Sequence, residues 1–449
     1  MTRVRTVAPT PIDFAVTAGA AVRDPEGYVA FWDGIARACS GSGFSFDHAA
    51  PVEHAPRYGT LRADSLERPL QVISGELPRS EVALDVPDRW EDLWDCVATV
   101  SFQLYDHNIL MVGLDGEVSR WLGAGTRGTT ARLDELQEGV IALTDLAATE
   151  VAARHLVPVL EVARRRDPTS TFIDWTDDEW QPVSPRWVSR SLVLDLEEPL
   201  ADVMVRHWLA DIGDSEPIEA FLRGETTHVQ RWLNYVHAGT RPDAVTTPVP
   251  GAVAAWRAMH YAQFFYAALD LVDDRLTTVL AETTRGRRAW ELAELTERLR
   301  SLSHRAELVM LHLQDLRKYV TRAVRTEMDH ILEVWTYADL VEEPVRFKIS
   351  ICDRRLEELA AGRQARAGTV TDVILLGIGV TSVLATALAV TDFGRTVATD
   401  PDQAGFGSTT SGLTEWFASQ PADAILISSV VLSALLVVLF LAVRRNGPS

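Results

Sequence analysis

Two stretches near the C-terminus form the longest runs without a charged residue. Residues 373–390 and 424–443 contain no Asp, Glu, Lys or Arg, and most of their side chains are apolar. At a helical rise of about 1.5 Å per residue, each run is long enough to cross a hydrocarbon core of about 30 Å. The pattern therefore predicts a transmembrane hairpin at 369–445, with an external loop at 391–423.

The distribution of arginine predicts how this hairpin is oriented. Arginine is frequent on the outer sides of the two runs and rare in the loop between them, at Arg354, Arg355, Arg363, Arg366, Arg444 and Arg445 against Arg395 alone. Because cytoplasmic flanks of membrane helices are enriched in Lys and Arg, both termini are expected in the cytoplasm. We expect a protein of the cell (inner) membrane that contacts membrane lipid.

Helical spacing of apolar residues continues upstream of the first run. Residues 251–368 are expected to form a helical stem, with one helix at 252–283, a second at 289–338 and a third that begins at Pro344. Apolar positions alternate at spacings of three and four, which is typical of supercoiled helices. A hairpin packed within one subunit and a coiled coil between subunits both fit this pattern.

Residues 1–240 mix strand and helix patterns. Residues 97–105 alternate between apolar and polar side chains, and a polar turn, Asp106-His107-Asn108, leads into the apolar run 109–114. This arrangement predicts a β-hairpin. Further strands are expected at 70–77 and 191–196, and helices at 27–39, 131–166, 200–212 and 218–235. The fold class predicted is an α+β (or α/β) cytoplasmic domain, followed by the stem and the transmembrane hairpin.

Composition restricts the partners of the predicted cytoplasmic domain. The formal net charge is −20, which argues against nucleic acid, because a nucleic-acid-binding surface is basic. Cations or a basic protein surface fit this charge better. The chain has three cysteines, Cys39, Cys96 and Cys352, without paired spacing, so neither a disulfide framework nor a zinc site is expected.

Motifs for catalysis are missing from the sequence. Residues 123–128 match a GxGxxG pattern, but the residues before them do not form a strand pattern, so the context for dinucleotide binding fails. No phosphate-binding loop, nucleophile elbow or zinc-protease motif occurs. We therefore expect no enzyme activity, and no cofactor is identified.

One acidic cluster is a candidate for metal binding. Oxygen ligands of this kind suit magnesium or calcium, and the alternative is a solvated acidic loop. The cluster consists of Asp174, Asp177, Asp178 and Glu179.

One face of the first apolar run carries small and hydroxyl residues. They allow close packing between membrane helices, and they could also line a narrow pore in an oligomer. The pore-lining candidates are Asp372, Gly379, Ser382, Thr386 and Ala389.

The order of parts resembles the CorA-type divalent-cation transporters. An acidic α/β body is followed by long helices, a stem entering the first span and a second span close to the C-terminus. The family's Gly-Met-Asn signature is absent, because the end of the first span reads Val390-Thr391-Asp392-Phe393-Gly394. The resemblance implies a homopentamer that conducts a cation, divalent in the family, and is gated by its cytoplasmic domain. The alternative is a membrane-anchored signalling or defence effector that senses a ligand or partner without selective transport.

Overall fold

The computed structural model divides the chain into two compact units, Met1–Cys352 and Asp353–Ser449. Each unit is described by itself. The described residues are 2–17, 20–40, 44–46, 71–123, 129–175, 184–198, 200–209, 215–239, 250–283, 289–399 and, after 420, residues 421, 424, 427, 428, 430, 431, 434 and 435.

An eight-stranded sheet forms the centre of the first unit. Its strand order is β3-β4-β5-β6-β1-β8-β10-β9, and every neighbouring pair is antiparallel except the parallel pair β8 and β10. The strands are β1 Arg3–Pro11, β3 Ser45–Phe46, β4 Gln71–Pro78, β5 Val97–Tyr105, β6 Ile109–Glu117, β8 Ser189–Leu194, β9 His228–Arg231 and β10 Asn234–Ala238. Two short strands, β2 Ala15–Val16 and β7 Ile173–Asp174, pair separately.

Helices cover one face of this sheet and enclose the larger apolar core. They are α1 Ala20–Arg23, α2 Pro25–Ala38, α4 Glu91–Trp94, α5 Ser119–Leu122, α6 Thr129–Glu150, α7 Val157–Arg166, α8 Ala201–Trp208 and α9 Glu216–Leu222. Phe102 and Leu104 from the sheet and Trp32 and Leu143 from the helices are almost fully buried in this core.

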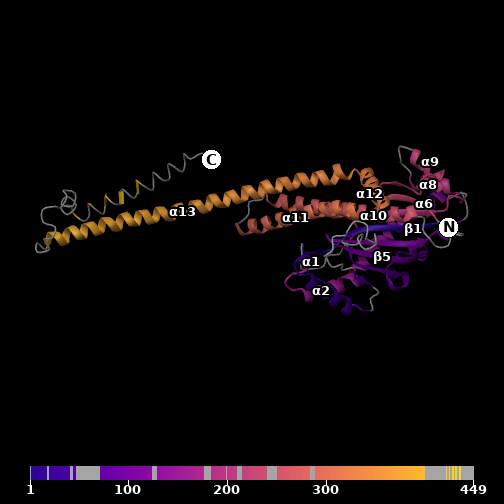
Figure 1. The fold of residues 1–449 in the computed structure, drawn as a ribbon, viewed down its shortest axis with the longest axis horizontal. Coiled ribbons are helices and arrows are strands. Elements are labelled where there is room, and N and C mark those ends of the chain that lie inside the picture. The colour runs from indigo at the N-terminus through magenta and orange to yellow at the C-terminus, as the bar shows by residue number, and fades with distance from the viewer. Residues whose placement is uncertain are drawn as a thin grey trace. The chain divides into compact units, whose positions relative to one another are not determined.

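A second group of helices covers the opposite face. It comprises α10 Pro250–Thr283, α11 Ala289–Tyr319 and α12 Arg322–Val334. The hydroxyl of Thr6 in β1 lies 2.9 Å from that of Thr144 in α6, whereas Arg5 lies over the ring of Trp256 in α10. Because neighbouring side chains of a strand point to opposite faces, α6 and α10 lie on opposite sides of the sheet. The first unit therefore has three layers, which can be followed in Figure 1 from α2 across β5 to α10.

The structure confirms the mixed α/β character of the N-terminal region and several of its predicted elements. The hairpin of β5 and β6 forms as expected, with His107 and Asn108 at positive φ in its turn. The strands at 70–77 and 191–196 correspond to β4 and β8, and the helices at 27–39 and 252–283 to α2 and α10.

Other predicted helices are interrupted. The helix expected at 289–338 ends at Tyr319, and α12 begins after Thr321, whose hydroxyl accepts a hydrogen bond from the backbone N–H of Val324. Such a cap satisfies a backbone donor of a new helix, so the chain restarts there instead of continuing. The helix at 131–166 contains a π-helical segment, Val151–Leu156.

The prediction of a helix at 218–235 is wrong beyond the first turns of that segment. It ends with α9 at Leu222, and the hairpin of β9 and β10 follows. Trp232 adopts a positive φ of 45° in the two-residue turn of this hairpin. Periodicity alone did not separate these short strands from a helix.

The transmembrane hairpin expected at 369–445 is contradicted. Within the part of the chain that the structure describes, no helix is both long and apolar enough to cross a membrane. Most of the second run, 424–443, lies outside the described residues. The prediction of an inner-membrane location with ion transport is overturned by the same finding.

Residues 373–390 belong to one long helix, α13 Glu343–Thr399. The sequence predicted that a helix begins at Pro344, and in the structure this helix begins at Glu343. Its first turns belong to the first unit, where Val345, Ile349 and Cys352 are buried. The Lys348 ammonium lies 2.6 Å from the Asp273 carboxylate of α10, so the start of α13 is attached to α10.

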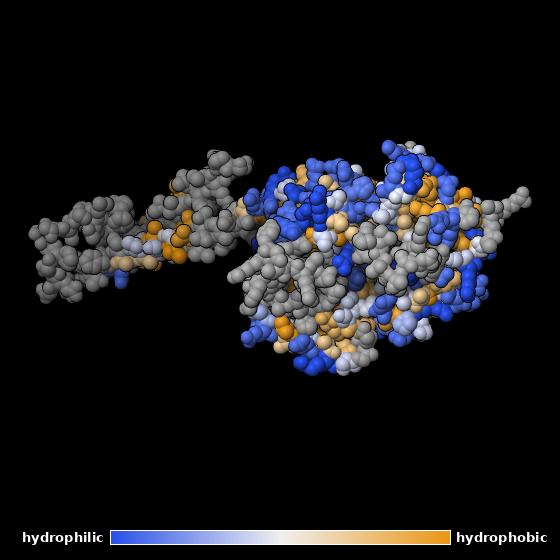
Figure 2. All heavy atoms as spheres, turned by 45° about the vertical axis from the view of Figure 1, so that its right-hand side comes forward, coloured by the Kyte–Doolittle hydropathy of each residue, from blue (hydrophilic) through white to orange (hydrophobic). Residues whose placement is uncertain are grey.

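The surface of the first unit is rich in charged residues. Figure 2 shows hydrophilic side chains interspersed with smaller hydrophobic areas on the face in view. This distribution agrees with a chain in which 24% of residues are charged.

Candidate functional site: a cavity between α10, α11 and β7

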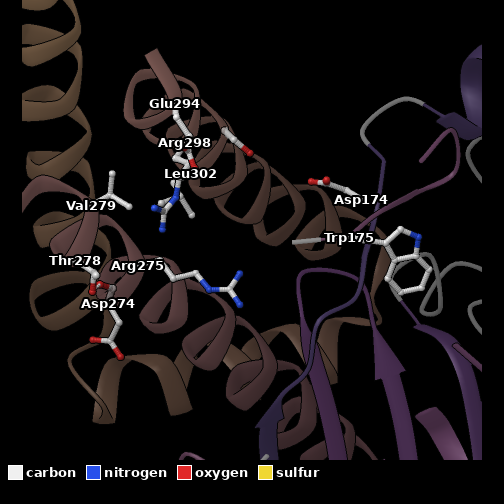
Figure 3. A pocket seen from close by; sticks show the side chains of 10 residues that line it. Asp174, Trp175, Asp274, Arg275, Thr278, Val279, Glu294, Arg298 and Leu302 are labelled. Atoms are coloured by element: carbon white, nitrogen blue, oxygen red, sulfur yellow. Dashed lines mark hydrogen bonds between the residues drawn. The ribbon is translucent and has the colours of Figure 1, made fainter. Parts of the chain in front are cut away.

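A cavity of about 680 Å³ lies between α10, α11 and the segment at β7. Its α10 wall contains Asp274, Arg275, Thr278 and Val279, its α11 wall contains Glu294, Arg298, Ser301 and Leu302, and the third side consists of Asp174 and Trp175. Figure 3 shows Arg275 extending from α10 into this space and Arg298 pointing toward the same space from α11. The cavity therefore collects side chains from segments far apart in the sequence.

The helical period explains why two arginines face this cavity. In α10, Leu276 and Val279 are buried, Thr278 is exposed, and Arg275, one turn before Val279, is partly buried at the edge of this packed side. In α11, Leu295 and Leu299 are buried in the same manner. Because positions three and four apart share one face of a helix, Arg298, three residues after Leu295 and four before Leu302, lies at the edge of the buried side, where it reaches the cavity.

Two of the cavity's three carboxylates are already paired with arginines that do not line it. Asp174 binds Arg305 of α11 at 2.7 Å, and Asp274 binds Arg186 at 2.5 Å. Arg186 also binds Asp270 at 2.5 Å. Burial alone would lower the pKa of Arg186, but its hydrogen bond with Asp274 and the charge of Asp270 outweigh burial, so its pKa is raised. Asp174 is therefore compensated from behind the cavity wall, whereas Asp274 shares its arginine with Asp270.

The remaining acid of the cavity, Glu294, lies one helical turn before Arg298. Arg298 also lies 3.6 Å from Glu282 at the end of α10, and this pair is largely exposed on the arginine side. An exposed ion pair of this length contributes little stability, typically about 0–1 kcal/mol. The arginine can therefore exchange its carboxylate partner for another anion. Arg298 can therefore turn toward a ligand at low cost.

Arg305 connects the cavity wall to the sheet. Its side chain is 9% exposed, and besides Asp174 it binds the Asn108 amide oxygen in the turn between β5 and β6. In the same turn, His107 Nε2 lies 2.8 Å from His312 Nδ1 of α11. Burial lowers the pKa of His107 to about 4, so this imidazole is neutral at pH 7. The predicted polar turn thus fixes α11 on the sheet.

The sequence-predicted site residues are only partly brought together. Asp174 lines the cavity, but its carboxylate pairs with Arg305, and Asp177, Asp178 and Glu179 lie outside the described residues. Among the residues searched, which are the described ones, no cluster of three or more His, Cys, Asp or Glu side chains is arranged to hold a metal ion.

The residues assigned to a pore lie in α13. Gly379, Ser382, Thr386 and Ala389 are exposed there, and the Thr386 hydroxyl donates to the Ser382 carbonyl at 2.8 Å. The side chain of Asp372 is not among the described ones. Their assignment to a pore depended on the transmembrane helix that the structure contradicts.

Sequence reasoning missed the two arginines of the cavity. Arg275 and Arg298 match no motif, and each reads as an ordinary exposed charge on a helix. The cavity exists because α10 and α11 pack beside β7, and that contact could not be inferred from periodicity.

Searches of protein-family models, curated proteins and solved structures found no match to this chain. The resemblance to CorA-type transporters, the homopentamer that it implies and the expectation of no enzyme activity therefore stay predictions, as do membrane lipid and further copies of the chain as partners.

Proposed function

We propose that this protein is a ligand sensor whose cavity between α10 and α11 binds a small phosphate-bearing anion. The observation that carries the proposal is the pair Arg275 and Arg298, which reach into one cavity of about 680 Å³ from two helices. Guanidinium groups suit phosphate because they offer several N–H donors in a planar fork. This function corresponds to the ligand-sensing alternative expected from the sequence, without its membrane anchor.

Anion binding at this cavity depends on its two guanidinium groups and not on the net charge around it. Asp174 pairs with Arg305, and Asp274 shares Arg186 with Asp270. Glu294 of the lining and Glu282, the partner of Arg298, lie beside the two arginines and would compete with a bound phosphate for them. The hydroxyls of Thr278 and Ser301 add polar groups on either side. The volume accommodates a ligand of nucleotide size.

The connection between α10 and α13 supports a sensing role. Asp273 and Thr277 lie beside the cavity wall on α10, and both bind the Lys348 ammonium of α13, at 2.6 and 2.7 Å. A ligand that pulls Arg275 and Arg298 together would shift α10, and α13 would respond through Lys348. A ligand changes a conformation only as far as it binds one state better, so this response requires contacts made by both arginines at once.

The test is direct binding measured by isothermal titration calorimetry on the full chain. The probes are ATP and inorganic pyrophosphate at low ionic strength. We expect one site per chain, with affinity reduced about tenfold to a hundredfold in Arg275→Ala and Arg298→Ala, because a hydrogen bond to a charged group contributes about 1.5–3 kcal/mol.

The matched control is Arg300→Ala, because Arg300 is exposed on α11 and pairs with Glu297 at 2.7 Å away from the cavity lining. This control should bind both probes as the natural sequence does. Absence of binding by both probes, or equal weakening in the control and the cavity variants, would refute the proposal.

A further inference from the structure

Four aromatic side chains enclose a second, smaller cavity in the first unit. It has a volume of about 190 Å³ and is lined by Trp187, Trp232, Leu233, Tyr266 and Trp335. The four aromatic residues are called the aromatic cage below. None of them lines the cavity between α10 and α11, so the two sites are separate.

The rings of the cage stand nearly perpendicular to one another. Trp187 and Tyr266 have centroids 5.5 Å apart at 89°, and Tyr266 and Trp335 have centroids 5.5 Å apart at 88°. Trp232 and Trp335 lie 6.3 Å apart at 60°. Walls at these angles present both ring faces and ring edges to the space between them.

The polar edges of two indoles are occupied by the protein itself. The Trp187 N–H donates to the Gln263 side-chain oxygen at 3.2 Å, and the Trp335 N–H donates to the Trp232 carbonyl at 2.9 Å. These bonds fix both rings and leave their apolar faces for the cavity. A ligand here would be recognised by aromatic faces and not by hydrogen bonds from these indoles.

The backbone of Trp232 adopts a conformation that is unfavourable for a bulky residue. Its φ is 45°, and its side chain is 49% exposed. The left-handed region costs about 1–2 kcal/mol for an ordinary L-residue, and two-residue hairpin turns usually place Asn or Gly there. Folding gains little from a strained, half-exposed Trp, so its position fits a role in binding.

Two carboxylates with cationic partners lie on the same face of α10 as Tyr266. Asp270, one helical turn beyond Tyr266, binds Arg186, which it shares with Asp274, and Asp273, about one turn farther, binds Lys348. One oxygen of Asp273, Oδ1, is buried without a hydrogen-bond partner among the described residues. The negative charge of the chain, −20, adds a favourable potential for cations.

We propose that the aromatic cage binds a methylated ammonium group, carried by a small molecule such as choline or by a trimethylated lysine side chain. Such groups are attracted by the negative faces of aromatic rings and are too apolar at their methyl surface to need hydrogen bonds. A cavity of about 190 Å³ is of suitable size, since one of about 150 Å³ holds benzene.

The experiment measures quenching of tryptophan fluorescence in the full chain. The probes are choline, its neutral isostere 3,3-dimethylbutan-1-ol, and two matched peptides with lysine or trimethyllysine. We expect choline or the trimethyllysine peptide to bind at least about tenfold more tightly than its neutral or unmethylated counterpart. The neutral isostere lacks the charge that the cation–π attraction requires, and the unmethylated lysine ammonium is strongly hydrated, so it loses more hydration on entering the cage. Whichever of the two cations binds more tightly shows whether the methylated ammonium group belongs to a small molecule or to a lysine side chain.

Variants then assign the binding to the cage. Trp232→Ala should abolish binding and Trp232→Phe should retain most of it, because Phe keeps an aromatic face. Phe347→Ala is the matched control, since Phe347 is 66% exposed on α13 and outside the cage.

The proposal would be overturned if neither cation bound more tightly than its neutral or unmethylated counterpart, or if the binding were unaffected by Trp232→Ala. These results are independent of the phosphate site, whose variants, Arg275→Ala and Arg298→Ala, leave the cage intact.

Discussion

Replacement of the buried His237 by leucine should make the folded protein less sensitive to acid. His237 lies in β10, is 4% exposed, and its Nε2 has no hydrogen-bond partner among the described residues. Burial, and to a lesser extent the charges of His228 and Arg5, lower its pKa from 6.5 to about 3. The folded protein therefore keeps this imidazole neutral, while the unfolded chain takes up a proton below about pH 6.5.

The sign and size of the effect follow from this difference in pKa. As the pH falls from 7 to 4.5, the unfolded state gains a proton at His237 that the folded state does not, so the free energy of unfolding decreases. Proton linkage gives a loss of about 2.5 kcal/mol over this interval for a single group whose pKa falls from 6.5 to about 3. His237→Leu should remove this contribution.

The assay is urea unfolding at pH 7 and at pH 4.5, followed by tryptophan fluorescence. The difference between the two pH values should be about 2.5 kcal/mol smaller in His237→Leu than in the natural sequence. His330→Leu is the control, because His330 is exposed on α12. An identical pH difference in all three proteins would refute the reasoning.

Two further predictions concern stability. Arg305→Met should lower the free energy of unfolding by about 3 kcal/mol, because it leaves Asn108 and Asp174 without their shared partner. The control Arg300→Met should have little effect. Equal midpoints of urea unfolding for these two variants would contradict this prediction. Thr321→Ala should cost about 1 kcal/mol through loss of the helix cap of α12, and Thr321→Ser, which keeps the hydroxyl, should restore most of it in thermal unfolding.

The local spacing of apolar and polar residues predicted the elements in which that spacing is regular. The hairpin at 97–114 and the helix at 252–283 follow directly from spacings of two and of three to four residues. The break at Thr321 was missed because a single capping hydroxyl decides it within a continuous apolar pattern. The hairpin of β9 and β10 was missed because its short strands also fit a helical spacing.

The sites depend on contacts that no local pattern contains. Arg275 and Arg298 line one cavity because α10 and α11 pack beside β7, and Asp174, a metal-binding candidate in the sequence, pairs with Arg305. The transmembrane prediction rested on the length of the apolar runs. The described residues contain no helix that is both long enough and apolar enough to cross a membrane.

The central claim is that the cavity between α10 and α11 binds an anionic ligand. Hydrogen exchange of the full chain, measured by mass spectrometry with and without ATP, tests it most directly. The account predicts slower exchange at 274–279 and 294–302, the two helical walls, and unchanged exchange in α7 at 157–166. Unchanged exchange at both walls with ATP at saturating concentration would contradict it.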